Sequence, residues 1–364
     1  MGLYIGSMDK SKLPVTITNE MLSRHKIYGV KFDGVNSMGV PTYDNIGLNW
    51  MPASEASPGI DDYKDLAPFN VKKYVTTYAS GARSAPVYEG DANYASLRAN
   101  ADYDCFVELP KGYYYRPSMW EFLVSPDPID GFLPDPAHDI GNGNTFSRVG
   151  RSEYDLSTGF KSRPDQYPLV SQTIAQFMTG LSNRGMYLQS YQAHCWVNIL
   201  RLIKQKDLNS QKVNGMGCNT GNATIVMTDS IKGLDGFKTS LDGNEPVRTL
   251  GIQNFYGNVW DFIGNCLTNN SKVYIRKDPR VTSVPANTAA ALNDGWIMHS
   301  GTVVGPSSGG APFDKISYDS SIPYAMFPTN LGGDDYNPIG DYTWNANNDP
   351  WSVVVLGGIT WDDY

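Results

Sequence analysis

Residues 251–262 read GIQNFYGNVWDF and combine turn-forming residues with core-forming ones. Gly251 and Gly257 permit tight turns, because glycine adopts backbone angles that other residues avoid. Asn258 has a short side chain that can hydrogen-bond neighbouring backbone. The large apolar side chains expected in the core are Val259, Trp260 and Phe262. The segment therefore predicts tight turns that lead into the hydrophobic core.

Residues 334–364 read DDYNPIGDYTWNANNDPWSVVVLGGITWDDY and consist mainly of Asp, Asn, Tyr and Trp, with no Lys or Arg after Lys315. Tyr and Trp supply rigid contact area at low entropic cost, and Asn and Asp supply adaptable hydrogen bonding, as in antibody paratopes. The apolar run at residues 353–356 predicts a supporting strand. We therefore predict a ligand-binding surface here. Its candidate residues are Tyr336, Asn337, Tyr342, Asn345, Asn347, Asn348, Trp351, Thr360, Asp362, Asp363 and Tyr364.

The N-terminal part divides by its pattern into an arm and a small domain. Residues 1–25 hold two short alternating stretches, 3–6 and 15–18, each of which predicts a strand too small to bury much alone. We expect this arm to pair with a partner chain or with the next domain. Residues 26–100 hold short β-prone runs separated by Gly, Pro, Asn and Ser, which predicts a small β-rich domain.

Residues 101–364 predict the main domain, in which two helices stand out. Apolar residues at i, i+3, i+4 and i+7 mark the first helix at 174–181 and the second at 196–203. Ser171 is the expected cap of the first helix and Gly185 its stop. Short strands are expected around them, at 105–109, 113–116 and 122–124 and in the loop-rich region after residue 215. The pattern therefore predicts an α+β fold with two helices, short antiparallel strands and long loops.

Charge and hydropathy argue against two classes of partner, nucleic acids and membranes. The net charge of −8 and a pI near 5.0 disfavour nucleic acid, whose binding depends on neutralising phosphates. No apolar run approaches the roughly 20 residues that span a bilayer. The opening residues also lack the apolar core of a secretory signal. We expect no nucleic-acid partner and no membrane insertion.

The cysteines and histidines show no catalytic or zinc-binding spacing. None of the four cysteines lies in a Cys-x-x-Cys pair, so we expect buried free thiols. His194 and Cys195 are adjacent on a predicted helix and therefore point about 100° apart, which argues against a dyad. We predict that the protein is not an enzyme and needs no cofactor.

Acidic residues leave two alternatives open. Asp229, Asp235, Asp242 and Glu245 fall in one Gly-rich stretch, but no EF-hand pattern is present. A structural calcium ion is the first alternative. Paired carboxylates also suggest glycoside hydrolysis, but their separation in space cannot be read from a sequence.

Residues 251–262 resemble the G-(L/V)-x-D-(M/L)-x-G-N-V-W-E-W signature of the formylglycine-generating-enzyme type of C-type lectin fold. The tail resembles the same family at residues 340–344 (GDYTW) and 355–361 (VLGGITW). It also resembles the variable region of retroelement-diversified proteins of phage tail tips and bacterial surfaces. The resemblance implies a C-type lectin-like fold for residues 101–364, with Trp344 and Trp361 in its core.

Several upstream segments occur in an order similar to that of gut-phage tail proteins. They are YEGDAN at 88–93, VELPKGYYY at 107–115, GFLPDPAH at 131–138 and LNSQ at 208–211. The opening YIGS at 4–7 also resembles these proteins.

Two features depart from the family. The sequence stops at Tyr364, before the usual last strand, and Val355 replaces an arginine of the enzyme-like members. Formylglycine generation also needs a cysteine pair near the C-terminus, and no cysteine follows Cys266.

The resemblance implies a non-enzymatic receptor-binding protein of a phage tail or bacterial cell surface. Its partners would be a bacterial surface protein or glycan and other tail subunits. Multivalent display favours a homo-oligomer, with a trimer as the first hypothesis. The alternatives are a structural tail or baseplate component whose C-terminal region packs on a partner subunit, and a glycan-acting enzyme.

Overall fold

The computed structural model describes residues 15–53, 57–79, 82–218, 227–229, 246–306, 309–334, 337–344 and 352–357. Strands account for 32% of the described residues and helices for 16%, which defines a mostly-β protein. The expected α+β class with two helices is therefore wrong. Many strands have only two to four residues, and runs this short give a weaker sequence pattern than the two long amphipathic helices.

The helices of the described residues differ greatly in length and burial. They are α1 (Asn19–Arg24), α2 (Tyr94–Ala99), α3 (Ile174–Ser182), α4 (Tyr191–Gln205), α5 (Ser210–Asn214) and α6 (Thr288–Asn293). The two predicted helices correspond to α3 and α4. The cap of α3 is Thr173, whose hydroxyl accepts from the Gln176 N–H, and not the expected Ser171. Ser171 instead adopts a left-handed backbone conformation with φ of 57°.

Two five-stranded sheets occupy the N-terminal half. The first runs in the order β11 (Leu133–Pro134), β9 (Tyr113–Ser118), β10 (Glu121–Ser125), β1 (Tyr28–Lys31) and β2 (Val40–Tyr43). The second runs β14 (Val149–Ser152), β8 (Tyr103–Leu109), β5 (Lys72–Ala79) and β6 (Ala82–Arg83), with β7 (Val87–Tyr88) also on β5. Since β1 pairs with β10 and β5 with β8, the expected boundary at residue 100 falls within both sheets.

Two smaller sheets occupy the C-terminal half. One is β21 (Trp296–Met298), β20 (Lys272–Arg276), β19 (Trp260–Asn269) and β25 (Ser352–Gly357); the other is β23 (Pro328–Leu331), β22 (Gly310–Ile316) and β24 (Tyr342–Trp344). Short pairs complete the described strands. They are β3 (Trp50–Met51) with β4 (Ile60–Asp61), β12 (Asp139–Gly141) with β13 (Asn144–Thr145), β15 (Leu156–Ser157) with β16 (Lys161–Ser162), and β17 (Arg248–Thr249) with β18 (Ile252–Gln253).

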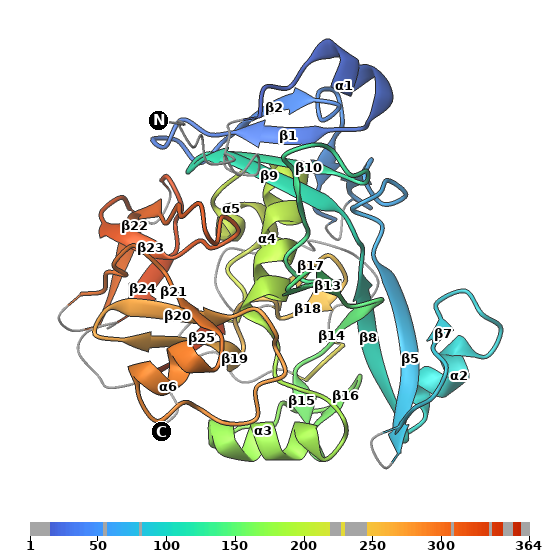
Figure 1. Cartoon of the computed structure of the whole chain (residues 1–364). Helices are drawn as coiled ribbons and strands as arrows, with labels where there is room; N and C mark the ends of the chain where they lie inside the picture. The colour runs from blue at the N-terminus through green and yellow to red at the C-terminus, as the bar shows by residue number, and fades with distance from the viewer. Residues whose placement is uncertain are drawn as a thin grey trace, which may run out of the picture.

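Helix α4 lies in the middle of the molecule, with the sheets around it (Figure 1). Its N-terminus is capped by Ser190, whose hydroxyl accepts from the Ala193 N–H at 3.0 Å, and its end by Lys206 in a left-handed conformation. The predicted apolar face is buried, with Trp196 fully inaccessible. One core cluster spans the chain from Tyr28 to Ile339 and includes this helix. The N-terminal and C-terminal sheets therefore share a core.

The described part of the arm forms a helix and not the second expected strand. Thr18 caps α1, because its hydroxyl accepts from the Met21 N–H at 3.2 Å. Val15 and Ile17 pack against a small cluster that includes Leu123. Residues 1–14, with the first expected strand, lie outside the described residues. In the part of the chain that the structure describes, no helix has the length and apolar character needed to cross a membrane.

Replacing Trp196 by Ala is expected to lower the free energy of unfolding by about 3 to 5 kcal/mol, because it empties the centre of the shared core. Its indole N–H also donates to the Pro110 carbonyl at 2.9 Å, and that partner would be lost. Chemical denaturation measures the change. Leu292→Ala on α6 is the control, since Leu292 is 49% exposed. Equal effects of the two substitutions would contradict the central role of α4.

Candidate functional site

Most of the candidate tail residues lie outside the described part of the chain. Asn337 is described and exposed, and its side-chain oxygen accepts from the Ser37 N–H at 3.4 Å. Tyr342 lies in β24, although its side chain is not described. The candidates outside the described residues are Tyr336, Asn345, Asn347, Asn348, Trp351, Thr360, Asp362, Asp363 and Tyr364. The tail surface therefore stays a prediction.

The described end of the tail lies beside a cleft. Strand β25 pairs antiparallel with β19, which places Gly357 opposite Trp260, Leu356 opposite Asp261 and Val355 opposite Phe262. Residues 260–262 form one wall of a cleft of about 320 Å³. The tail strand thus supports the strand that carries this wall.

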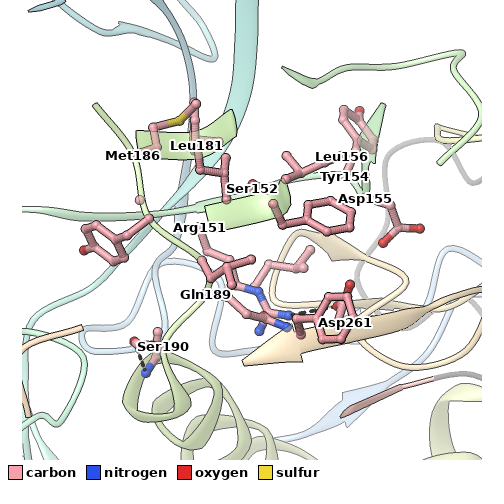
Figure 2. Close-up of a pocket in the computed structure, with 18 of the residues that line it drawn as sticks. Arg151, Ser152, Tyr154, Asp155, Leu156, Leu181, Met186, Gln189, Ser190 and Asp261 are labelled. Atoms are coloured by element: carbon pink, nitrogen blue, oxygen red, sulfur yellow. Dashed lines mark hydrogen bonds and ion pairs between the residues drawn. The ribbon is translucent and has the colours of Figure 1, made fainter. Parts of the chain in front are cut away.

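The cleft lies between the second sheet, helix α3, the start of α4 and strand β19, and it has aromatic walls and a polar base. Arg151, Gln189 and Asp261 lie close together in it (Figure 2). Its aromatic lining residues are Tyr74, Tyr78, Phe106, Phe146, Tyr154, Phe177, Tyr187, Trp260 and Phe262. Its charged lining residues are Arg83, Arg148, Arg151, Asp155 and Asp261. Apolar walls with a few convergent polar groups are the usual composition of a small-ligand site.

The segment at 251–262 forms the turns that its sequence predicts. Gly251 and Gly257 have φ angles of 77° and 83°, and Asn254 and Asn258 are also left-handed. Both asparagine side chains donate to Asp155 Oδ2, at 2.8 and 2.9 Å. These bonds fix the turn against the segment that follows β14.

The apolar end of the same segment lines the cleft, and of its three large side chains Phe262 also packs against a core cluster. The side chains expected in the core, Val259, Trp260 and Phe262, are only half-buried. An apolar side chain gives the same sequence pattern in a core as in a pocket wall, so the difference depends on what faces it. Here the facing elements are β14 and α3, which leave a space unfilled.

Arg151 on β14 is a buried charge at the base of the cleft. Its side chain is 7% exposed, and Nη1 has no hydrogen-bond partner among the described residues. The nearest carboxylate oxygen, Asp261 Oδ2, is 4.0 Å from Nη2. The guanidinium lies 4.7 Å from the centre of the Phe255 ring. Burial lowers the pKa of Arg151 to about 10, so the group stays charged at neutral pH.

Asp155 and Asp261 are carboxyl groups that resist ionisation. Burial raises the pKa of each, and the negative charge of Asp261 raises the pKa of Asp155 further. The positive charge of Arg151 lowers the pKa of both carboxyl groups and partly offsets these shifts. A hydrogen bond from Gln189 also lowers the pKa of Asp261. Two such carboxyls in one cleft could bind hydroxyl groups or exchange protons with a ligand.

Sequence reasoning did not find this cleft. Arg151 and Asp155 lie in RSEYD, which matches no binding motif, and Asp261 is more than a hundred residues away. Only the tertiary structure brings the three side chains together. The one sequence motif that lies next to the cleft is the segment at 251–262, and its pattern indicates a structural role.

A buried ion network lies behind the cleft. Glu153 is within 3.0 Å of Lys73 and 3.5 Å of Arg248, and Asp229 is within 2.7 Å of Arg98. Asp229, a candidate ligand in the calcium alternative, is therefore paired with arginine. The other three residues of that stretch, Asp235, Asp242 and Glu245, lie outside the described residues, and no metal-binding cluster occurs among the described ones.

The four cysteines are free and buried, as expected. His194 does not face Cys195. Its ring stacks on Phe255 with the centres 4.6 Å apart. Burial and the nearby Arg151 hold the pKa of His194 well below its usual range, so the ring is neutral at physiological pH.

No protein-family model matches this chain, and no curated protein matches its sequence.

Asp155→Asn is expected to stabilise the protein above neutral pH. A raised carboxyl pKa means that between pH about 4 and the raised value the folded state binds more protons than the unfolded state. The free energy of unfolding of the wild type therefore falls as pH rises through this window. Asparagine keeps an acceptor for Asn254 and Asn258 without the charge, and the gain at pH 8 is expected to be about 1 to 3 kcal/mol.

Denaturant titrations from pH 5 to pH 8 measure this gain. Asp278→Asn is the control, since Asp278 forms an ion pair with Arg280 and its pKa is lowered. A pH slope in Asp155→Asn as steep as that of the wild type would show that Asp155 ionises freely in the folded state.

Proposed function

We propose that this chain is a non-enzymatic binding protein that recognises a glycan on a bacterial cell, as a receptor-binding component of a phage tail or a comparable surface appendage. The observation that carries the proposal is the cleft with aromatic walls and a polar base. A cavity of about 320 Å³ has room for a small ligand such as a sugar unit.

The lining suits a saccharide. The C–H faces of a sugar ring are apolar and pack on aromatic rings such as Trp260 and Tyr187. Sugar hydroxyls both donate and accept hydrogen bonds, and the cleft offers carboxyl oxygens, amide groups and a guanidinium. Asp261, Gln189 and Arg151 supply these groups around one point of the cleft (Figure 2).

The phage-tail part of the proposal rests on the ordered upstream segments and on the tail composition. Strand β25 of the tail is paired with the cleft wall, so a surface built on the tail would adjoin the cleft. Weak single contacts would need multivalent display, which favours a homo-oligomer, with a trimer as the working hypothesis.

A second candidate is a glycan hydrolase. The observation that favours it is the pair Asp155 and Asp261, whose carboxyl pKa values are both raised in one cleft. Glycosidases use such a pair as acid and as base or nucleophile. Hydrogen bonds from Asn254 and Asn258 to Asp155 favour a structural role for that residue instead.

Trp260→Ala is expected to weaken binding to host-cell polysaccharide by about tenfold or more, because central aromatic contacts dominate recognition sites. Isothermal titration calorimetry on extracted surface polysaccharide measures the affinity. Tyr318→Ala is the control, since Tyr318 is 42% exposed and does not line the cleft. Unchanged affinity in a folded Trp260→Ala variant would contradict the cleft proposal. Release of new reducing ends, lost in Asp261→Asn, would establish the hydrolase instead.

The tail prediction is tested by replacing Tyr342, Asn347 and Trp351 together with Ala. If the tail forms a contact surface, adsorption of the protein to host cells is expected to fall about tenfold while cleft binding to soluble saccharide is retained. Flow cytometry with labelled protein measures adsorption. Full adsorption by a well-folded triple variant would refute the tail surface.

A further inference from the structure

We propose that the ligand of the cleft is an acidic saccharide, whose carboxylate binds Arg151 while its sugar ring packs on the aromatic walls. This inference rests on the proposed glycan-binding function and names the class of glycan. It is carried by a buried arginine whose Nη1 has no hydrogen-bond partner among the described residues, in a cleft large enough for a sugar (Figure 2).

The guanidinium of Arg151 lacks the acceptors that a buried arginine normally has. A guanidinium carries five N–H donors, and buried donors are almost always paired. Nη1 has no partner among the described residues, and the 4.0 Å approach of Asp261 to Nη2 is too long for a hydrogen bond. Phe255 covers one face of the group and supplies no acceptor oxygen. The missing acceptor must come from outside the described protein groups.

The charges of the lining favour an anion. Three arginines line the cleft, at positions 83, 148 and 151, and no lysine does, although the chain has a net charge of −8. Arg148 is neutralised by Glu108, with Nε 2.8 Å from Oε2. The acidic lining residues are Asp155 and Asp261, and both carboxyl pKa values are raised. Arg83 is exposed, so Arg151 is the buried cation of the cleft.

Geometry favours a carboxylate attached to a ring over a free inorganic anion. The planar guanidinium fork matches the two oxygens of a carboxylate. A free phosphate or sulfate would leave most of the 320 Å³ space and the rings of Trp260 and Tyr187 without a contact. A pyranose that bears a carboxylate fills both the polar and the aromatic part.

Asp261 competes with the ligand for Arg151. The groups that face Arg151 are Asp261 from β19, Asp155 after β14, Gln189 before α4 and His194 on α4. Burial holds the pKa of His194 well below its usual range, which favours the neutral ring. As pH falls, Asp261 takes up a proton and no longer attracts Arg151, and protonation of Asp155 removes a second negative charge. A sugar carboxylate, with a pKa of about 3.5, stays ionised. Binding is therefore expected to tighten as pH falls.

The test is a glycan array read at pH 5.5 and pH 8. It carries oligosaccharides of glucuronic, galacturonic and sialic acid, and each is printed beside its carboxyl-reduced form. Wild-type protein is expected to bind at least one acidic member about 10- to 100-fold more tightly than its reduced form, and more tightly at pH 5.5. Arg151→Lys and Arg151→Gln are expected to bind the acidic member and its reduced form with similar affinity. Arg24→Gln, on the exposed α1, is the control.

Asp261→Asn tests the same inference without removing the arginine. It is expected to raise affinity for the acidic member at pH 8 and to flatten the pH dependence, because the competing charge is gone. This variant keeps the inference falsifiable if the Arg151 variants fail to fold. Equal affinity of Asp261→Asn and wild type at pH 8, with an equal pH slope, would overturn it.

The outcomes separate this inference from the proposed function. Equal binding of acidic and reduced forms, abolished by Trp260→Ala, overturns the acidic class and leaves glycan binding in place. Binding of inorganic phosphate or sulfate alone, with no saccharide bound, overturns both. Binding to host-cell protein but to no member of the array also overturns both.

Discussion

Helix α4 is hydrogen-bonded to three of the sheets around it or to residues that follow their strands, and it donates two of these bonds and accepts one. These bonds help to fix the positions of the sheets. The Trp196 indole donates to Pro110 at the end of β8, and Asn45 after β2 donates to the Ile203 carbonyl at 3.0 Å. On the other side, Asn265 of β19 accepts from the Tyr191 N–H at 2.9 Å. Buried polar groups must be paired, so each contact fixes an orientation as well as a distance. A helix held in this way sets the angle between the N-terminal and C-terminal sheets.

The cleft follows from that arrangement. Strand β14 belongs to the N-terminal sheets and β19 to the C-terminal ones, and the two are joined near the cleft by the bonds from Asn254 and Asn258 to Asp155. On β14, Val149 and Arg151 alternate with the more exposed Gly150 and Ser152, so the arginine takes a position that the strand period assigns to an inward side chain. A buried charge without full compensation is costly. A protein that retains such a charge violates a folding preference, and violations of this kind concentrate at functional sites.

The local parts of the fold could be predicted from the sequence, and its class could not. Strands β5 and β8 coincide with β-prone runs, helices α3 and α4 have clear 3.6-residue patterns, and Gly251 and Gly257 lie in turns. The two helices were the strongest signals, so they weighed most in an α+β prediction. The strands that outweigh them are often two to four residues long, and their existence depends on pairing partners far away in the chain.

The candidate site is harder to predict from the sequence than the fold, for a physical reason. Arg151, Asp155 and Asp261 acquire their properties from burial and from one another, and neither is encoded in a local pattern. The position of Trp260 cannot be predicted for the same reason. An aromatic ring that lines a cleft and one that fills a core can have the same neighbours in the sequence. The side chain becomes a wall because the facing strand and helix do not close over it.

The pairing of β25 with β19 connects the two parts of the molecule for which binding is proposed. Gly357 of β25 lies opposite Trp260 of β19. The strand that carries the cleft wall is therefore paired along one edge with the tail. Ladder hydrogen bonds depend on backbone atoms and not on side-chain identity. Side chains of the tail could therefore change from one protein to another while the backbone pairing, and with it the position of Trp260, stays the same. In such an arrangement the cleft would bind a common chemical group, and the tail would provide contacts that differ from one protein to another.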